Sequence, residues 1–392
     1  MKKKCFFIGT PLQRTAVSAH FQALAHELVR RGHEAVIIAP PGECEPDPND
    51  TRFHVHAWPS TRPTHLADAA FLWRLIGHYR PDCLIANFAP VNWMCLVGWL
   101  RRVHCRIAWY HTLSSQIGID TKLTPWKLQF LRLRKRLVYR RATHLAVNSR
   151  AALDDACETF GVPAEKCKVW RNSLPNPEPS LGLSGISERE NLVVCAGRFD
   201  RTKGQDVLIK ALALCGEKLG TTKVEFLGVG PLLDSVRTKA GQLGILDRCF
   251  FRGSVTHDEV MKRMSSARVT VVPSRSEAFG LVNIESMAVG TPVIASGVDG
   301  IREIVRDGVD GFLVPPDDAS ALARRLVALL GDPALRQTLG ANARERFLNV
   351  YEQSRVVAAQ ADWLEKITAP ALVTAVEQLP ACKTTGTTDG IH

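Results

Sequence analysis

Two glutamates flank a glycine that immediately precedes an expected helix. They occur in VTVVPSRSEAFGLVNIESMAVGTPVIAS, where Glu277 falls in a loop and Glu285 falls one turn into the helix that follows Gly280. Such a glycine lets backbone N–H groups approach an anion, and a helix N-terminus favours phosphate. A carboxylate one turn further on can accept hydrogen bonds from paired sugar hydroxyls. Taken alone, the segment is equally compatible with Glu277 as a helix cap and Glu285 as a solvated surface residue.

A second group of candidate residues combines cations with glycines. Gly197, Arg198, Lys203 and Gly204 occur in CAGRFDRTKG, between an apolar strand-like run and the apolar helix VLIKALAL. Open parallel sheets bind ligands at the carboxyl ends of their strands. A guanidinium fork and a compact ammonium group together suit a diphosphate. A solvated basic turn is the alternative, but two cations beside two glycines favour anion binding.

Strand-like and helix-like segments alternate along the chain and must position these side chains. The alternation is the pattern of parallel sheets covered by helices, and it restarts after a segment rich in proline and glycine. The expected strands are KCFFIGT, AVIIA, DCLIA, CRIAWYH, HLAVNS and CKVWR, then LVVCAGR, VEFLGVG, CFFRGSV, RVTVVPS and PVIAS. The sequence therefore predicts an α/β protein with two Rossmann-like domains.

The predicted organisation has five parts. Residues 1–172 form the first Rossmann-like domain, 173–190 a linker rich in proline and glycine, and 191–350 the second Rossmann-like domain. Residues 351–368 form a C-terminal helix that crosses back to the first domain. Residues 369–392 lack apolar periodicity, and we expect them to form a mobile tail.

Composition excludes several classes of protein. The 392 residues are 45% hydrophobic and 23% charged, which rules out collagen, coiled coil and wholesale disorder. The 11 cysteines show no CxxC spacing, so structural thiols in a reducing compartment are expected instead of disulfides or zinc ligands. The longest uncharged run, residues 83–100, is interrupted by Asn87, Pro90 and Asn92, and we interpret it as a strand and a helix, not as a membrane span.

The net charge of +11 is confined to the first part of the chain. Residues 1–180 contain 25 basic and 14 acidic residues, whereas residues 181–392 contain 25 of each. This asymmetry predicts an anionic or membrane-associated partner for the first half. A nucleic acid is the weaker alternative, because that half has no aromatic stacking platform or known binding module.

Most of the chain resembles the retaining glycosyltransferases of family four, which have the GT-B architecture of two Rossmann-like domains facing a central cleft. The resemblance is strongest from residue 192 to about residue 330 and is carried by AGRFDRTKG, EFLGVGP, EAFGLVNIESMAVGTPVI and GVDGIREIVRDGVDGFLVPPDD. It implies transfer of a sugar from a UDP- or GDP-type donor, with retention, to a saccharide, lipid-linked or small-molecule acceptor. It implies no metal and no cofactor, since the nucleotide sugar is a substrate. A nucleotide-sugar epimerase or another enzyme on this fold, such as a phosphorylase, is the alternative.

The resemblance also implies roles for individual residues. Arg198 and Lys203 would neutralise the donor diphosphate, Glu285 would hold the ribose hydroxyls, and Glu277 would contact the donor sugar. His111, at the end of the strand CRIAWYH, matches a histidine near that sugar, although a lone histidine is usually structural. Arg198, Lys203, Glu277 and His111 form the implied catalytic set. The residues implied to approach the sugar, phosphate or nucleobase are Phe279, Gly280, Leu281, Gly197, Gly228, Gly230, Gly253 and Val255.

The first loop departs from the family pattern. The family usually has paired glycines there, whereas IGTPLQR has only Gly9. Gly9, Thr10 and Arg14 are therefore candidate contacts to phosphate or acceptor with no assigned role. Acceptor selection is expected from the first domain.

A basic amphipathic helix is expected over residues 127–141. It places Leu128, Leu131, Leu137 and Val138 among seven cations. Such a helix can lie on an anionic membrane surface, which suits a cytoplasmic enzyme peripheral to the inner face of a membrane. The alternative, slightly favoured by the sequence, is an ordinary helix packed by its leucines with a solvated basic face.

Overall fold

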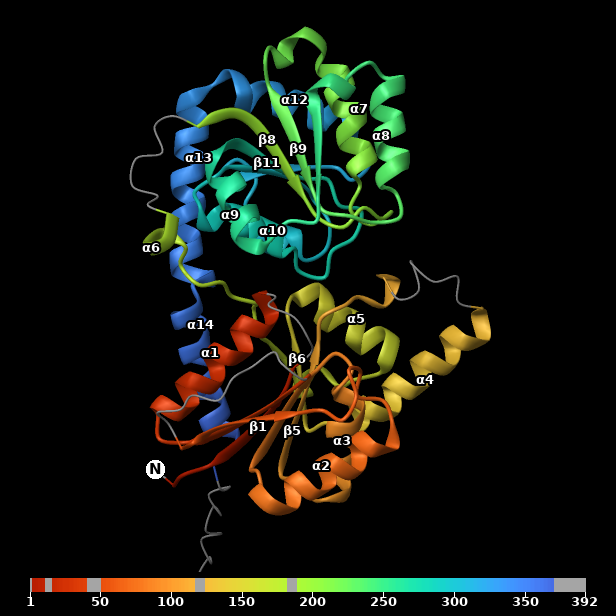
Figure 1. Ribbon diagram of the computed structural model, residues 1–392, viewed down its shortest axis with the longest axis vertical. Coiled ribbons are helices and arrows are strands. Elements are labelled where there is room, and N and C mark those ends of the chain that lie inside the picture. Colours follow the sequence, from red (N-terminus) through yellow and green to blue (C-terminus); the bar gives the residue numbers. More distant parts are fainter. Residues whose placement is uncertain (1, 11–15, 41–50, 117–123, 182–188, 370–392) are drawn as a thin grey trace, which may run out of the picture.

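Two parallel sheets divide the chain. The computed structural model describes residues 2–10, 16–40, 51–116, 124–181 and 189–369 (Figure 1). The first sheet has the strand order β3-β2-β1-β4-β5-β6-β7. Its strands are β1 (Cys5–Gly9), β2 (Glu34–Ala39), β3 (Phe53–Ala57), β4 (Cys83–Asn87), β5 (Cys105–Tyr110), β6 (His144–Val147) and β7 (Cys167–Val169). The order reverses between β1 and β4, and such a reversal opens a crevice at the carboxyl ends of the strands.

The second sheet repeats this plan with the order β10-β9-β8-β11-β12-β13. Its strands are β8 (Glu190–Ala196), β9 (Lys223–Leu227), β10 (Cys249–Gly253), β11 (Ala267–Val272), β12 (Val293–Ser296) and β13 (Gly311–Val314). The reversal falls between β8 and β11, the strands that precede the two candidate loops. The predicted fold class, two Rossmann-like domains in the GT-B arrangement, is confirmed.

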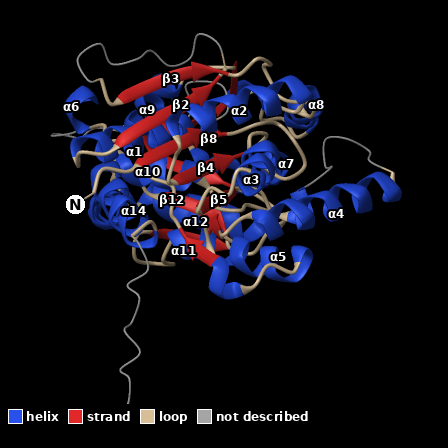
Figure 2. Cartoon of the chain, turned by 90° about the horizontal axis from the view of Figure 1, so that it is seen from below, coloured by secondary structure: helices blue, strands red, loops and turns tan. Residues whose placement is uncertain are grey.

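Helices cover both faces of each sheet and enclose four apolar clusters. The helices of the first half are α1 (Ala16–Arg30), α2 (Leu66–Tyr79), α3 (Val91–Leu100), α4 (Pro125–Arg141), α5 (Arg150–Phe160) and α6 (Glu178–Leu181). Those of the second half are α7 (Gln205–Cys215), α8 (Leu233–Gln242), α9 (His257–Ser266), α10 (Leu281–Ala288), α11 (Ile301–Ile304), α12 (Ala319–Gly331), α13 (Pro333–Arg346) and α14 (Gln353–Ile367). Figure 2 shows the helices around the strands, with α4 projecting from the body of the first domain.

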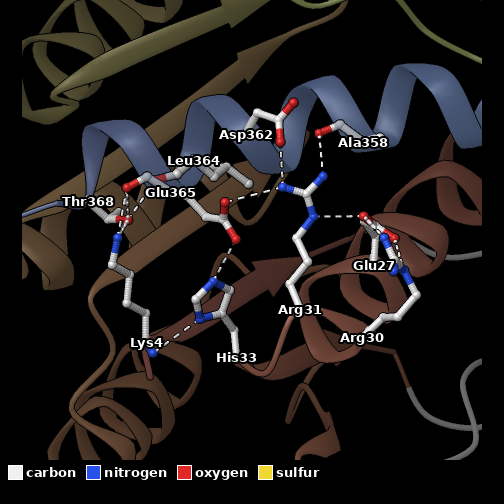
Figure 3. Close-up of polar contacts among 10 residues, drawn as sticks. All are labelled: Lys4, Glu27, Arg30, Arg31, His33, Ala358, Asp362, Leu364, Glu365 and Thr368. Carbon is white, nitrogen blue, oxygen red and sulfur yellow. Dashed lines mark hydrogen bonds and ion pairs between the residues drawn. The ribbon is translucent and has the colours of Figure 1, made fainter. Parts of the chain in front are cut away.

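The last helix, α14, packs on the first domain against α1. The Arg31 guanidinium on the α1 side reaches Asp362 Oδ1 at 2.5 Å and Glu365 Oε2 at 3.2 Å (Figure 3). His33 Nε2 lies 2.9 Å from Glu365 Oε1, and Lys4 Nζ donates to the Thr368 hydroxyl at 2.9 Å. The chain therefore ends its described course on the domain where it began.

The two chain segments that pass between the domains run side by side. Leu174 donates its N–H to the Tyr351 carbonyl at 3.2 Å, and its own carbonyl accepts from the Gln353 N–H at 2.9 Å. The linker expected over 173–190 contains α6, while residues 182–188 lie outside the described residues. Most of the tail expected over 369–392 lies outside them as well.

Several expectations about single segments can be compared with the structure. Residues 83–100 form β4 and α3, as expected, and no helix in the described ranges is both long and apolar enough to cross a bilayer. The nine described cysteines are free thiols. Two strands, β3 and β13, were absent from the expected set, because β3 is a short edge strand with alternating histidines and β13 has only four residues.

Candidate active site

The loops that follow β8 and β11 bring Lys203 and Glu277 together. Their ammonium and carboxylate groups form an ion pair, and Ser274 Oγ lies 3.1 Å from the same Glu277 oxygen. Glu277 is only 8% exposed, whereas the Lys203 side chain retains 27% exposure. Glu277 is therefore neither a helix cap nor a solvated residue. The sequence analysis gave Lys203 and Glu277 separate roles, whereas in the structure they form one ion pair.

Glu285 lies on the first turns of α10 and is also 8% exposed. Its Oε1 is 3.1 Å from Nε2 of His257, the first residue of α9. This hydrogen bond raises the pKa of His257, which favours the imidazolium form beside the carboxylate. The interpretation of Glu285 as a solvated surface residue is therefore wrong.

Two glycines at this edge of the second sheet, Gly280 and Gly228, occupy positions that a residue with a side chain could not easily take. Gly280, the N-cap of α10, has a φ of +95°, a conformation that disfavours side chains. A Cβ at Gly228 would lie 2.2 Å from the Gly197 carbonyl oxygen. The close approach at Gly228 thus brings the ends of β8 and β9 together, so the chain itself requires glycine there.

The remaining predicted residues of the second domain lie around the same edge. Arg198 is exposed on the loop after β8. Gly230 packs against the backbone of Phe199, and Gly253 at the end of β10 accepts a hydrogen bond from the Gly228 N–H at 2.8 Å. The others are Gly197, Phe279, Leu281 and Val255, of which Phe279 is buried and the rest are half-buried.

His111 follows β5 on the facing edge of the first sheet. Its ring stacks on Phe88 at 4.6 Å and on Trp109 at 5.3 Å between centroids. Burial, with a smaller effect of His20, lowers the pKa of His111 to about 3, so the ring is neutral at ordinary pH. Its Nε2 is buried and has no hydrogen-bond partner among the residues that the structure describes. An orphaned buried nitrogen is unusual in a purely structural histidine, since buried polar atoms are normally satisfied.

Of the first loop, the structure describes Gly9 and Thr10. Gly9 ends β1, its carbonyl accepts from Asn87 Nδ2 at 3.0 Å, and a Cβ there would collide with Met94. Thr10 is buried beside it. Arg14 lies outside the described residues.

Hydrogen bonds tie the two edges to each other. Gln116 donates to the Ser276 carbonyl at 3.1 Å, and Ser149 Oγ donates to the Ala278 carbonyl at 2.5 Å. Glu303 accepts from the backbone N–H of Arg150 at 2.7 Å, at the start of α5. The loop that carries Glu277 is thus anchored to the first domain, and the two candidate residue sets share one interdomain region.

Sequence reasoning missed residues that support the site. His257 was missed because it lies two elements away from Glu285 along the chain, although it follows the segment FRGSV that was already a candidate. Ser274 was missed for lack of any motif of its own. Phe88, which stacks on His111, has a left-handed φ of 53° that no sequence pattern indicated. Within the described residues, no group of three His, Cys, Asp or Glu side chains has metal-binding geometry.

Two facing Rossmann-like domains with these loops at their switch points define the GT-B class of glycosyltransferases. Residues 17–175 match the model of Glycosyltransferase Family 4, and residues 183–346 match that of Glycosyl transferases group 1. The chain belongs to glycosyltransferase family four, and it is a glycosyltransferase.

Individual relatives extend over much of the chain. It is 27% identical to the GDP-mannose-dependent α-(1-6)-phosphatidylinositol monomannoside mannosyltransferase of Mycolicibacterium smegmatis, over 87% of this chain and 92% of that protein. It is 37% identical to a D-inositol 3-phosphate glycosyltransferase of Salinispora arenicola, over 70% and 66% respectively. The sucrose-phosphate synthase structure from Thermosynechococcus elongatus superposes with a TM-score of 0.73 at 21% identity, covering 94% of this chain and all of that one.

Proposed function

We propose that this glycosyltransferase moves a sugar from a UDP- or GDP-type donor to a saccharide, lipid-linked or small-molecule acceptor with retention of anomeric configuration. The observation that carries the proposal is the ion pair of the half-buried Lys203 with the buried Glu277 beside α10, with Glu285 one turn into that helix. The donor diphosphate would meet Arg198 and Lys203. Glu285 would hold the ribose, and Glu277 the donor sugar.

The chemistry of the leaving group supports this assignment of the cations. Departure of a nucleoside diphosphate places growing negative charge on its phosphate oxygens. The cations of this loop and the N-terminus of α10 at the switch point would stabilise that charge in the transition state. We propose that these groups suffice and that transfer uses no resident metal or other cofactor. When the phosphate binds Lys203, the Glu277 carboxylate becomes available to sugar hydroxyls.

His111 supports the placement of the acceptor on the first domain. A neutral imidazole with an unsatisfied Nε2 can exchange a hydrogen bond with a hydroxyl of the donor sugar or of the acceptor. Its stacking between Phe88 and Trp109 fixes the ring plane. The first domain also carries the net positive charge, which favours an acceptor that bears phosphate or lies at an anionic surface.

The exposed face of α4 supports a peripheral position on an anionic membrane surface. Trp126, Phe130, Leu133 and Leu137 are 65%, 64%, 53% and 43% exposed and recur at helical spacing along one side. Of the four apolar residues that we expected to pack if this is an ordinary helix, Leu128, Leu131 and Val138 are half-buried, whereas Leu137 is exposed. An exposed apolar stripe among seven cations and no acidic residue is typical of helices that insert at a membrane interface. Free thiols favour the cytoplasmic side.

The proposal is tested by following the fate of the donor. Purified protein is incubated with each common UDP- and GDP-sugar, with and without an acceptor extract, and nucleoside diphosphate release is measured. Release that requires the acceptor, with a product anomer identical to that of the donor by NMR, supports retaining transfer. An inverted product would refute retention, and an isomerised nucleotide sugar would indicate an epimerase.

A further inference from the structure

A cavity of about 280 Å³ lies in the first domain against His111. Its walls come from the end of β5, from the turn between β4 and α3, and from the half-buried side of α4. It therefore shares His111 with the proposed transfer site, while the other described residues of its lining all belong to the first domain. Its volume is close to the lower end of small-molecule sites, which fits a compact polar group.

Three cations of the described ranges line this cavity: Arg62, Arg134 and Lys135. In the part of the chain that the structure describes, none of them forms an ion pair with a carboxylate. The carboxylate of Asp155 acts on Lys135 from a distance, but it is engaged by the Tyr110 hydroxyl and by the Ser114 N–H at 2.7 Å. Among the described residues that line the cavity, none is acidic.

Lys135 is the most enclosed of the three cations. Its Nζ lies 5.5 Å from the ring centroid of Tyr110 and 5.5 Å from that of Phe160. Burial, and next the neighbouring Arg134, lower the pKa of Lys135 to about 8. Lys135 is half-buried, whereas Arg62 and Arg134 are exposed, and a charge as enclosed as that of Lys135 is favoured when an anion joins it. The cavity is therefore electrostatically prepared for a negatively charged group.

Another part of the lining is aromatic and strained. Phe88 has a φ of 53°, a conformation that is costly for a bulky residue, and it remains 46% exposed while stacking on His111. Strained residues concentrate where function requires a particular side-chain position. An exposed ring face beside polar groups is suited to the C–H face of a sugar or polyol ring. The cavity thus combines an anion-binding wall with a ring-binding wall.

We propose that this cavity binds the phosphate group of the acceptor, with Arg134, Lys135 and Arg62 as its counter-charges and Phe88 beside the attached sugar or polyol. The inference rests on the proposed transfer reaction, because His111 links the cavity to the donor. The first turn of α3 adds an electropositive helix end to the lining of the cavity. The phosphate is either a soluble phosphomonoester or the phosphodiester of a lipid headgroup, and both have the chemistry that the cavity requires.

Binding of defined probes tests the proposal independently of transfer. Glycerol 3-phosphate, titrated by phosphorus NMR, represents the soluble source. Vesicles of phosphatidylcholine and phosphatidylinositol in equal parts, assayed by sedimentation, represent the lipid source. The test variant is Arg134→Gln with Lys135→Gln. The control, Arg132→Gln with Arg140→Gln, removes the same charge from exposed positions of α4 outside the cavity.

We expect the wild type to bind at least one probe and the test variant to bind it about tenfold or more weakly, as for the loss of charged hydrogen bonds. The control should retain its affinity for the soluble probe. If the lipid is the source, the test variant should lose more vesicle binding than the control. Equal affinity of the two variants for every probe, or a wild type that binds neither, overturns the proposal.

Two further measurements keep the result interpretable. Melting curves establish that each variant is folded, and Arg62→Gln at an exposed position replaces the double variant if that one unfolds. Nucleoside diphosphate binding is measured on the same samples and should be unchanged in both variants. If the wild type does not bind nucleoside diphosphate, the proposed donor site is refuted, while the phosphate titration still reports on the cavity.

Discussion

Removing the charge of Lys203 should destabilise the protein and slow transfer for two separable reasons. The Glu277 residue is only 8% exposed. In Lys203→Met its carboxylate keeps the hydrogen bond from the Ser274 hydroxyl but loses its counter-charge. Breaking a fully buried pair costs about 3–5 kcal/mol. Because the Lys203 side chain is 27% exposed, water can partly replace it, and we expect a loss of about 2 kcal/mol in the free energy of unfolding.

The double variant separates stability from catalysis. Lys203→Met combined with Glu277→Gln leaves no unpaired charge, so its loss of stability should be smaller than the sum of the single losses by about 1–2 kcal/mol. Its transfer rate should nevertheless remain low, because nothing replaces the cation at the leaving diphosphate. Loss of one such electrostatic group costs about 2–4 kcal/mol of barrier, or roughly 30- to 1000-fold in turnover.

Urea unfolding followed by circular dichroism gives the stabilities, and nucleoside diphosphate release gives the rates. Lys210→Met, at an exposed position of α7, is the matched control and should change neither quantity. Strictly additive destabilisation in the double variant would show that the two groups do not interact. Full turnover by Lys203→Met would refute the role of Lys203 at the diphosphate.

Two further predictions concern His257 and α4. The pKa of His257 is raised in the folded protein, so the stabilisation from its pair with Glu285 is fully present below pH 6.5 and is lost as the pH rises through the folded-state pKa. The free energy of unfolding of the wild type should therefore fall by up to about 1 kcal/mol relative to that of His257→Gln as the pH is raised above 6.5. Paired urea titrations over that range check this, and a constant difference would contradict it. On α4, Trp126→Ser with Phe130→Ser should markedly weaken sedimentation with anionic vesicles at low salt while leaving the melting temperature unchanged. Undiminished sedimentation would remove α4 as the membrane contact.

The fold could be predicted from the sequence to the extent that local patterns determine it. Apolar runs bounded by glycine and helix signals identified the strands that carry the loops, and those loops lie at the carboxyl ends of their strands, as expected. That these two strands flank the switch point follows only from the sheet order. The short strand β13 and the edge strand β3 lack such runs. The linkage of α14 to α1 through Arg31, Asp362 and Glu365 depends on contacts distant in sequence, which no local pattern contains.

The site was predictable as a set of residues but not as a set of contacts. Glu277, Glu285 and Lys203 were identified from glycine-flanked loops, yet the pairing of Lys203 with Glu277 and of His257 with Glu285 depends on the sheet order. The sequence could not decide which side of α4 packs, because apolar residues occur on two sides of that helix. The cavity cations likewise meet only in the folded chain, since Arg62 comes from a loop distant from Arg134.

The affinity for nucleoside diphosphate measures the central claim most directly. Calorimetric titration of UDP and GDP into wild type, Arg198→Gln and Arg201→Gln compares two arginines of one loop, of which only Arg198 is assigned to the diphosphate. We predict that wild type and Arg201→Gln bind one of these nucleotides equally, and that Arg198→Gln binds it about 10- to 100-fold more weakly, the effect of a lost charged hydrogen bond. Absence of binding to the wild type, or equal affinity in all three proteins, would contradict the assignment of the donor site.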